Sequence, residues 1–140
     1  MAYITSRRDE LPSSRKEMEG STWYNMWKRK LWPYRELVEG DLVYWYESRN
    51  KRVVWVSRLN RIERFQYRNK EQAARRIEKR LDGVNRNERY YKKGPARGYC
   101  LAYKVLVVKK INLPKPYGVA FRRSGWERVN EKWLRALRAW

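Results

Sequence analysis

Aromatic side chains that lie next to hydrogen-bonding groups are the residues of this sequence best suited to chemistry. Trp23, Tyr24 and Asn25 are consecutive, and a second aromatic segment runs from Asp41 to Ser48. A Trp or Tyr ring can stack on a planar heterocycle such as a nucleobase. Carboxylates and amides accept hydrogen bonds from an exocyclic amine, whereas hydroxyls and amides donate to a ring carbonyl. The predicted base pocket consists of Trp23, Tyr24, Asn25, Asp41, Trp45, Tyr46, Ser48 and Trp126.

The same residue types also have a purely structural interpretation, because a small barrel needs large apolar rings in its core. The rings assigned to the core are Trp27, Trp55, Trp133 and Trp140. For Trp23 and Tyr24, which lie beside a basic segment, core packing and base stacking both stay open. Asp41 follows Gly40 and can simply close the turn before its strand.

The charge of the chain indicates a polyanionic partner. Lys and Arg number 35 against 15 Asp and Glu, which gives a formal net charge of +20. Such a charge destabilises a compact state by self-repulsion, and phosphates offset it. For many basic residues, a solvated face is the alternative, and the segment Arg122 to Gly125 can be either a phosphate site or a plain loop. The predicted phosphate-binding residues are Arg58, Arg75, Arg76, Lys79, Lys92, Lys93, Arg97, Arg122 and Arg123.

Several classes of active site find no support in the sequence. Histidine is absent, which removes the commonest general base and metal ligand. Cys100 is the only cysteine and lies in a predicted strand, so we expect a buried, inert thiol and no zinc site. No Gly-rich phosphate loop occurs. We therefore expect a protein that is not an enzyme, with no catalytic residue, no metal and no cofactor.

Length and composition favour one domain over residues 1–140. The longest apolar run, Val105 to Val108, is far too short to span a bilayer, and the first residues lack the apolar core of a secretory signal. We expect a monomer in a reducing, cytoplasmic compartment, associated with the nucleoid if the source is bacterial. The expected partner is nucleic acid, with DNA preferred and RNA possible, and no membrane.

The first half of the sequence predicts a strand, a short helix and a hairpin. Residues 2–6 form the strand, and the polar residues 7–20 a surface loop. Trp23, Trp27 and Leu31 recur every four residues, which predicts one face of a helix that Pro33 ends. Two β-rich runs at 42–46 and 52–62, separated by a polar turn, predict the hairpin.

The second half predicts a helix, a long strand and a last helix. Asn69 and Gln72 have the spacing of a helix start, and Asp82-Gly83 marks the end of that helix. The basic residues 85–97 predict a mobile loop and residues 98–111 the longest strand. A last amphipathic helix is predicted from the stripe Trp126, Val129, Trp133, Leu137 and Trp140. This order of elements indicates a small α+β barrel.

One segment resembles a known family. Val38 to Ser48, with Gly40-Asp41 before an apolar strand and Tyr46-Glu47-Ser48 after it, is similar to the corresponding segment of EVE domains. Val53 to Leu59 is similar to their next strand, and Trp23 to Asn25 lies where they have a ligand-site Trp and Asn. The chain departs from the EVE pattern at Glu47, where His is common, and it lacks the Gly-x-Lys-x-x-Glu signature of ASCH domains.

The resemblance implies a fold and a function. EVE domains belong with the PUA, ASCH, YTH and SRA families, which share a twisted β-barrel flanked by helices. Many members bind nucleic acid, and several hold a flipped, modified base in an aromatic pocket. We therefore expect a DNA-binding reader of a modified base, with 5-methylcytosine favoured. The alternatives are an RNA-binding PUA-like module and a basic protein that coats nucleic acid without a base pocket.

Overall fold

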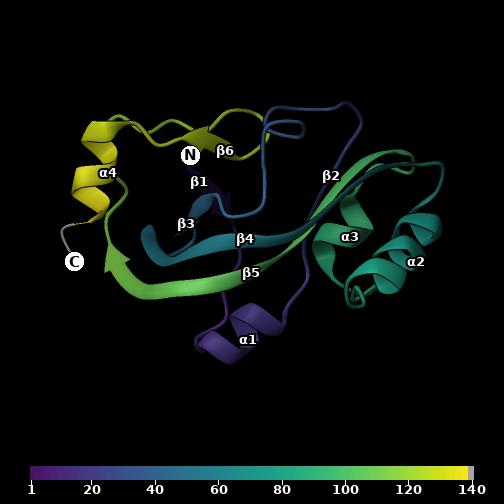
Figure 1. The fold of residues 1–140 in the computed structure, drawn as a ribbon. Helices are drawn as coiled ribbons and strands as arrows, with labels where there is room; N and C mark the ends of the chain where they lie inside the picture. The colour runs from purple at the N-terminus through teal and green to yellow at the C-terminus, as the bar shows by residue number, and fades with distance from the viewer. Residues whose placement is uncertain (139–140) are drawn as a thin grey trace.

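Two long strands, β4 and β5, run through the whole molecule and carry the other elements (Figure 1). The computed structural model describes residues 1–138. The strands form one six-stranded sheet in the order β2-β5-β4-β3-β1-β6, with β1 parallel to β3 and all other pairs antiparallel. The elements are β1 Ala2–Arg7, α1 Arg15–Gly20, β2 Trp23–Trp27, β3 Leu42–Glu47, β4 Arg52–Tyr67, α2 Lys70–Arg80, α3 Arg89–Lys93, β5 Gly98–Leu113, β6 Trp126–Arg128 and α4 Glu131–Leu137.

The sheet curls because the β4–β5 ladder is interrupted in its middle. The register shifts between Leu59 and Ile62, and Arg61 at this bulge has a φ of 113°. A bulge bends a strand and increases its twist. Before the bulge, β4 pairs with β3 as well as with β5. Beyond the bulge, β5 pairs with β4 on one side and with β2 on the other. The sheet thereby becomes a curled half-barrel whose two end strands, β2 and β6, approach each other.

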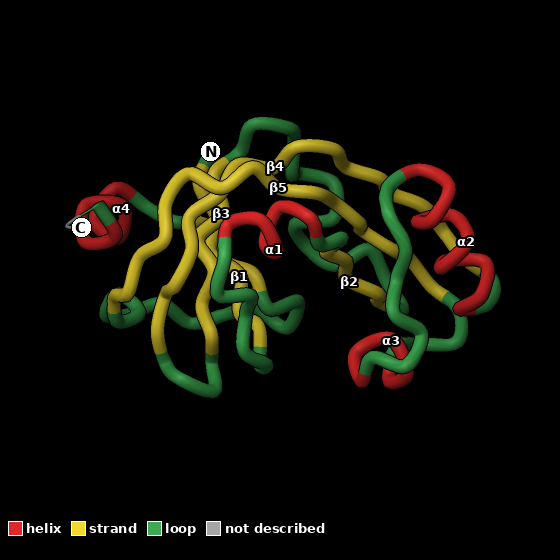
Figure 2. Tube along the Cα trace, turned by 90° about the horizontal axis from the view of Figure 1, so that it is seen from below, coloured by secondary structure: helices red, strands yellow, loops and turns green. Residues whose placement is uncertain are grey.

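Buried clusters lie on both faces of the sheet, which explains why its strands are so rich in aromatic residues. The inner face packs Tyr3, Trp45 and Trp126 with other rings in one cluster. On the outer face, α2 and α3 cover one end of the sheet and α4 covers the other, so the helices lie at opposite ends in both views (Figures 1 and 2). Cys100 is fully buried under α2 and α3, as expected, and burial raises the pKa of its thiol.

Most predicted elements are confirmed, and so is the α+β barrel class. The first strand, the hairpin of β3 and β4, and the long strand β5 all form. Helix α2 begins where the cap residues predicted, since the Asn69 side chain accepts from the backbone N–H of Gln72 at 2.8 Å. No helix among residues 1–138 is long and apolar enough to cross a membrane.

The predicted helix at residues 21–31 is wrong, because Trp23 to Trp27 form strand β2 and pair with Tyr99 to Tyr103. Spacing of four residues places side chains on one face of a helix, but it also places them on one face of a strand. Trp23 and Trp27 both pack on the inner cluster, whereas Tyr24 and Met26 belong to the outer one. The four-residue spacing alone therefore could not distinguish a helix from a strand.

Three other boundaries differ from the prediction. The predicted loop at 7–20 contains α1, and the predicted loop at 85–97 contains α3. The last helix is shorter than its apolar stripe, because Asn130 caps α4 by accepting from the backbone N–H of Trp133 at 2.8 Å. Trp126 therefore lies in β6 and Val129 in the connection, while Trp140 lies outside the described residues. Trp27 and Trp55 are buried in the core as predicted. Trp133, in α4, is half-buried against the outer-face cluster that α4 covers.

Candidate nucleic-acid interface

Side chains, not a strand ladder, join the two ends of the half-barrel along a line that we call the seam. At the end of β1, a guanidinium N–H of Arg7 donates to the backbone carbonyl of Tyr24 in β2 at 3.3 Å. The indole N–H of Trp126 in β6 donates to Oδ1 of Asn25 at 3.1 Å. Because Asn25 and Trp126 are buried, their bond fixes the closed end of the seam. Arg7 stands at the open end.

A cavity of about 350 Å³, the seam cleft, occupies that open end. This volume lies within the range of small-ligand sites, roughly 300–1,000 Å³. The cleft combines aromatic rings with charges of both signs. Its lining residues are Arg7, Arg8, Asp9, Glu10, Leu11, Pro12, Ser21, Thr22, Trp23, Tyr24, Glu88 and Tyr90.

Trp23 is held rigidly in the cleft. Its half-buried ring lies 4.8 Å from the ring of Trp45, and its indole N–H donates to the Met18 carbonyl at 3.2 Å. The Arg7 guanidinium lies 5.8 Å from the Trp23 ring centroid and 5.3 Å from that of Trp45. A buried Nε–H of Arg7 has no hydrogen-bond partner among the described residues. The cleft thus presents a fixed indole beside a cation.

Tyr24, Glu88 and Tyr90 form another wall of the cleft. The Tyr24 hydroxyl donates to Oε2 of Glu88 at 3.1 Å. Burial and the neighbouring Glu88 carboxylate raise the pKa of Tyr24, so the phenol stays protonated and keeps donating. The exposed Tyr90 ring stands edge-on to Tyr24 at 5.5 Å, and its hydroxyl accepts from the backbone N–H of Met26 at 3.0 Å. Glu88, itself exposed, retains acceptor positions that face the cleft.

Of the predicted pocket residues, only Trp23 and Tyr24 line the cleft. Trp45 and Trp126 are fully buried. Trp45 packs against Trp23, and Trp126 bonds Asn25 at the closed end of the seam. Trp45 donates its indole N–H to Ser57 at 2.8 Å.

The polar members of the predicted set also lie elsewhere. Asp41 accepts from the Val38 backbone N–H at 2.9 Å and pairs with the N-terminal amine at 3.3 Å, which is the role expected of a residue that closes a turn. Tyr46 stacks on Phe121 at 5.6 Å, among the residues that pack under α4. Ser48 donates its backbone N–H to the carbonyl of Arg7 at 2.8 Å, next to the cleft without lining it.

Sequence reasoning missed Arg7, Glu88 and Tyr90. Arg7 shows no local pattern that separates it from the other arginines of the chain. Glu88 did leave a signal, since it is the only acidic residue between Gly83 and Leu113 in an otherwise basic stretch. Tyr90 falls within the segment 85–97 that was predicted to be a loop, and it reaches the cleft because α3 lies against β2.

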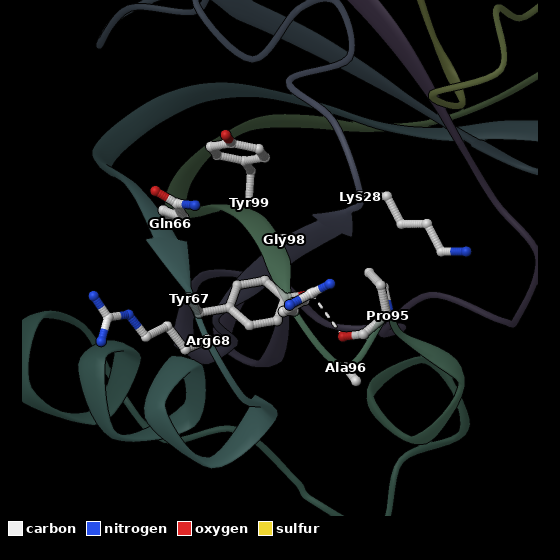
Figure 3. Close-up of a pocket in the computed structure, with 9 residues that line it drawn as sticks. Lys28, Gln66, Tyr67, Arg68, Pro95, Ala96, Gly98 and Tyr99 are labelled. Carbon is white, nitrogen blue, oxygen red and sulfur yellow. Dashed lines mark hydrogen bonds between the residues drawn. The ribbon is translucent and has the colours of Figure 1, made fainter.

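Two basic cavities lie beyond the end of β2, and no carboxylate of the described residues lines either of them. The first, the β2 pocket, has a volume of about 480 Å³ and is lined by Met26, Trp27, Lys28, Arg29, Leu31, Lys93, Pro95 and Arg123. The second, the strand-end groove, has a volume of about 790 Å³ and lies where β4 ends and β5 begins (Figure 3). Its lining residues are Lys28, Gln66, Tyr67, Arg68, Pro95, Ala96, Arg97, Gly98 and Tyr99.

The predicted phosphate-binding residues divide into three groups. Lys93 and Arg123 line the β2 pocket, and Arg97 lines the strand-end groove. Lys79 and Lys92 are exposed on α2 and α3. The others have partners within the protein. Arg58 donates to the Gly40 carbonyl at 2.9 Å, and Arg75 pairs with Glu71 at 3.5 Å. Arg76 lies 5.0 Å from the Phe65 ring, and Arg122 lies 3.7 Å from the Trp32 ring and 3.4 Å from Glu127.

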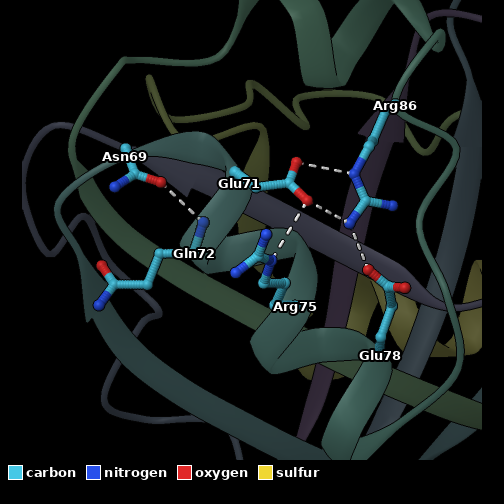
Figure 4. Close-up of polar contacts among 6 residues, drawn as sticks. All are labelled: Asn69, Glu71, Gln72, Arg75, Glu78 and Arg86. Carbon is cyan, nitrogen blue, oxygen red and sulfur yellow. Dashed lines mark hydrogen bonds and ion pairs between the residues drawn. The ribbon is translucent and has the colours of Figure 1, made fainter.

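An arginine holds the wall that carries Glu88 and Tyr90. Arg86 donates Nε–H and an Nη2–H to the two carboxylate oxygens of Glu71 at 2.9 and 2.8 Å, and it also bonds Glu78 (Figure 4). Because Glu71 and Glu78 belong to α2, this contact ties the segment before α3 to that helix. The Arg86 hydrogen bond lowers the pKa of Glu71, and the two carboxylates raise the pKa of Arg86.

The fold matches known structures although the sequence does not match a known family. No protein-family model matches the chain, and no curated protein sequence does so. The crystal structure of an ASCH protein from Zymomonas mobilis superposes with a TM-score of 0.60 at 13% identity, over 97% of this chain and 92% of that protein. Variants of that protein with a serine-to-alanine or tyrosine-to-phenylalanine change give TM-scores of 0.63 at 13% identity and 0.64 at 12% identity, over 97% of this chain and 93% and 95% of theirs. The expectation of a PUA-like architecture is thereby confirmed: this chain has the fold of ASCH domains.

Proposed function

We propose that the protein is a non-catalytic nucleic-acid reader that holds one extruded base in the seam cleft and grips neighbouring phosphates beyond the end of β2. One observation carries this proposal: cavities of two kinds follow the same edge strand. The seam cleft at the start of β2 has aromatic rings and charges of both signs, whereas the β2 pocket at its end has only basic charged residues. Phosphate contacts position a nucleic acid, and contacts to bases specify it.

The base that we propose is 5-methylcytosine in DNA. Glu88 can accept from the exocyclic amine of cytosine, and Trp23 offers a ring face beside the Arg7 cation. Extruding a base costs a few kcal/mol, while stacking on an aromatic ring returns roughly 1–3 kcal/mol. Burying a methyl group adds about 0.8 kcal/mol, which gives a modest but usable selectivity.

The architecture supports the same proposal. Through the resemblance described above, the PUA-like fold is one that many nucleic-acid-binding domains share. The matched crystal structures of ASCH proteins support the proposal through this shared fold. The net charge of +20 adds the electrostatic attraction that phosphate binding needs.

The test is a parallel titration of the full-length protein with a methylated DNA duplex, the unmethylated duplex and a structured RNA. The methylated duplex should bind most tightly, and all ligands should remain intact on denaturing gels. Tighter binding of RNA would replace this proposal by the RNA-binding module, and equal binding of all three would favour a coat protein. Cleavage of a ligand would contradict the non-catalytic assignment.

A variant makes the titration specific for the base. Glu88→Gln keeps the shape of the side chain but replaces an acceptor oxygen with an amide donor. With duplexes that carry one mismatched, easily extruded base, it should shift preference from cytosine toward thymine, whose O4 is an acceptor. An unchanged ratio of the two affinities would remove Glu88 from the base site.

A further inference from the structure

We propose that the strand-end groove is a second nucleotide site, which binds the phosphate and the base of an unpaired nucleotide in the strand whose extruded base occupies the seam cleft. This extends the proposed function and rests on it only in assigning both nucleotides to one strand. The groove lies at the far end of β2 from the seam cleft and shares no lining residue with it, so it is a separate site.

The charges of the groove suit a phosphate. Lys28, Arg68 and Arg97 are all exposed and line it, and no acidic residue does. Lys28 and Arg68 lie on opposite sides of the groove, just after the ends of β2 and β4, and their charged groups are directed outward (Figure 3). None of the three has a carboxylate partner among the ion pairs of the described residues, so their charges remain available to a ligand.

The remaining lining residues suit a base. Tyr99 is half-buried, with its ring edge against Tyr34 at 5.9 Å and Lys30 5.2 Å from its centroid, so its position is fixed. A base that is not already stacked on a neighbouring base can stack on a Tyr ring held in a fixed position. Gln66 is exposed beside it, and its amide can both donate and accept, as the edges of bases require. A paired base keeps its edge and faces covered, which is why we assign an unpaired nucleotide.

The groove is built rigidly. The Tyr67 hydroxyl donates to the Pro95 carbonyl at 2.9 Å, which joins the end of β4 to the segment before β5 (Figure 3). At Gly98, φ is 159°, and a Cβ would lie 2.1 Å from the carbonyl oxygen of Trp27, so only glycine lets β5 start this close to β2. Lys28 and Pro95 line both the groove and the β2 pocket, so the two cavities are adjacent.

The experiment compares two charge-reversed variants of the full chain. Arg68→Glu with Arg97→Glu alters the groove, and Lys132→Glu with Arg135→Glu makes the same change of charge on α4, at the opposite end of the molecule (Figure 1). The probes are a fluorescein-labelled 12-mer of oligodeoxythymidine and the same strand paired with its complement, measured by anisotropy. We expect the groove variant to weaken single-strand binding at least tenfold more than the α4 variant does. Its salt slope should also become shallower by roughly 1.4, because each lost contact on a single strand contributes about 0.7.

A second measurement locates the base. The 12-mer with 5-iodouracil at each position in turn is photo-crosslinked to the unaltered protein, and the adducts are mapped by peptide mass spectrometry. An adduct on Tyr99 from one position supports the proposal. Equal weakening by both variants, equal weakening of single strand and duplex, or adducts confined to other residues would each overturn it. A protein that shows these groove effects without preferring methylated DNA would overturn the base assignment in the seam cleft and leave the groove as a nucleotide site.

Discussion

At the scale of single residues, strand alternation gives neighbouring aromatic rings different tasks. Trp23 points to the inner face and offers its ring to the seam cleft, whereas Tyr24 is 4% exposed and packs under α3. Tyr24 therefore acts through its hydroxyl, which holds Glu88, and not through a free ring face. If the cleft holds a base as proposed, its stacking partners are Trp23 and Tyr90, which is 37% exposed.

Replacing Trp23 with Ala should therefore lower affinity for methylated DNA by roughly 1–3 kcal/mol, about five- to 150-fold. Binding to unmethylated DNA and the salt slope should change little, because the basic cavities are untouched. The matched control is Trp133→Ala, which removes a half-buried Trp at the α4 end. Anisotropy titrations report the affinities and thermal melting the stability. If Trp23→Ala stays folded and keeps the full preference for methylated DNA, the base does not stack in the seam cleft.

At the scale of elements, the wall of the cleft depends on a contact between α2 and the segment before α3. Arg86→Ala removes that contact, so backbone amides of residues 84–92 should exchange hydrogen faster while those of β4 and β5 stay protected. The control is Arg75→Ala, whose side chain is 78% exposed and has one pairing with Glu71. Hydrogen exchange followed by mass spectrometry measures the difference. Equal exchange in the two variants would show that α3 is held without Arg86.

The same contact should respond to pH in one direction. The pKa of Glu71 is lowered by its bond to Arg86, so the stabilisation is complete above the ordinary Glu pKa and is lost as pH falls below it. Protection of residues 84–92 should accordingly be constant around neutral pH. It should decline selectively under acidic conditions in the unaltered protein and not in Arg86→Ala, in which the contact is already absent.

Helices and strands were predictable from the sequence wherever the residue pattern or a capping residue fitted only one type of secondary structure. The Asn69 cap fixed the start of α2, and the dense β-branched and aromatic runs of β3 and β5 allowed only strands. Segment 23–27 failed because every fourth residue shares a face in both a helix and a strand. The seam cleft could not be predicted, since Arg7, Trp23 and Glu88 meet only when the sheet curls. Curling depends on the bulge near Arg61, and the residue types around that position do not predict a bulge.

At the scale of the whole molecule, the C-terminal segment closes the half-barrel. Trp126 is fully buried and bonded to Asn25, β6 is the last strand of the sheet, and Leu137 of α4 is buried against the outer face. Deleting residues 126–140 should leave the protein unfolded or aggregated, because losing one buried Trp costs roughly 3–5 kcal/mol and a domain has only about 5–15 kcal/mol to lose. Circular dichroism and size-exclusion chromatography measure the result. A soluble truncation that still binds DNA would show that the seam is not needed for folding.

The net charge of +20 should make binding strongly dependent on salt. If the protein neutralises about six phosphates of a duplex, log K should fall with log salt at a slope of roughly −5. About six phosphates suit the limited length of backbone that a small domain covers, and the basic residues that line the β2 pocket are the first candidates for those contacts. Replacing Lys93 and Arg123 with Ala should flatten the slope by about one unit per lost contact and weaken methylated and unmethylated DNA alike. The control is Lys132→Ala on α4. A slope shallower than about −2 in the unaltered protein would mean that its charge serves another purpose, and phosphate gripping would no longer explain the composition of the chain.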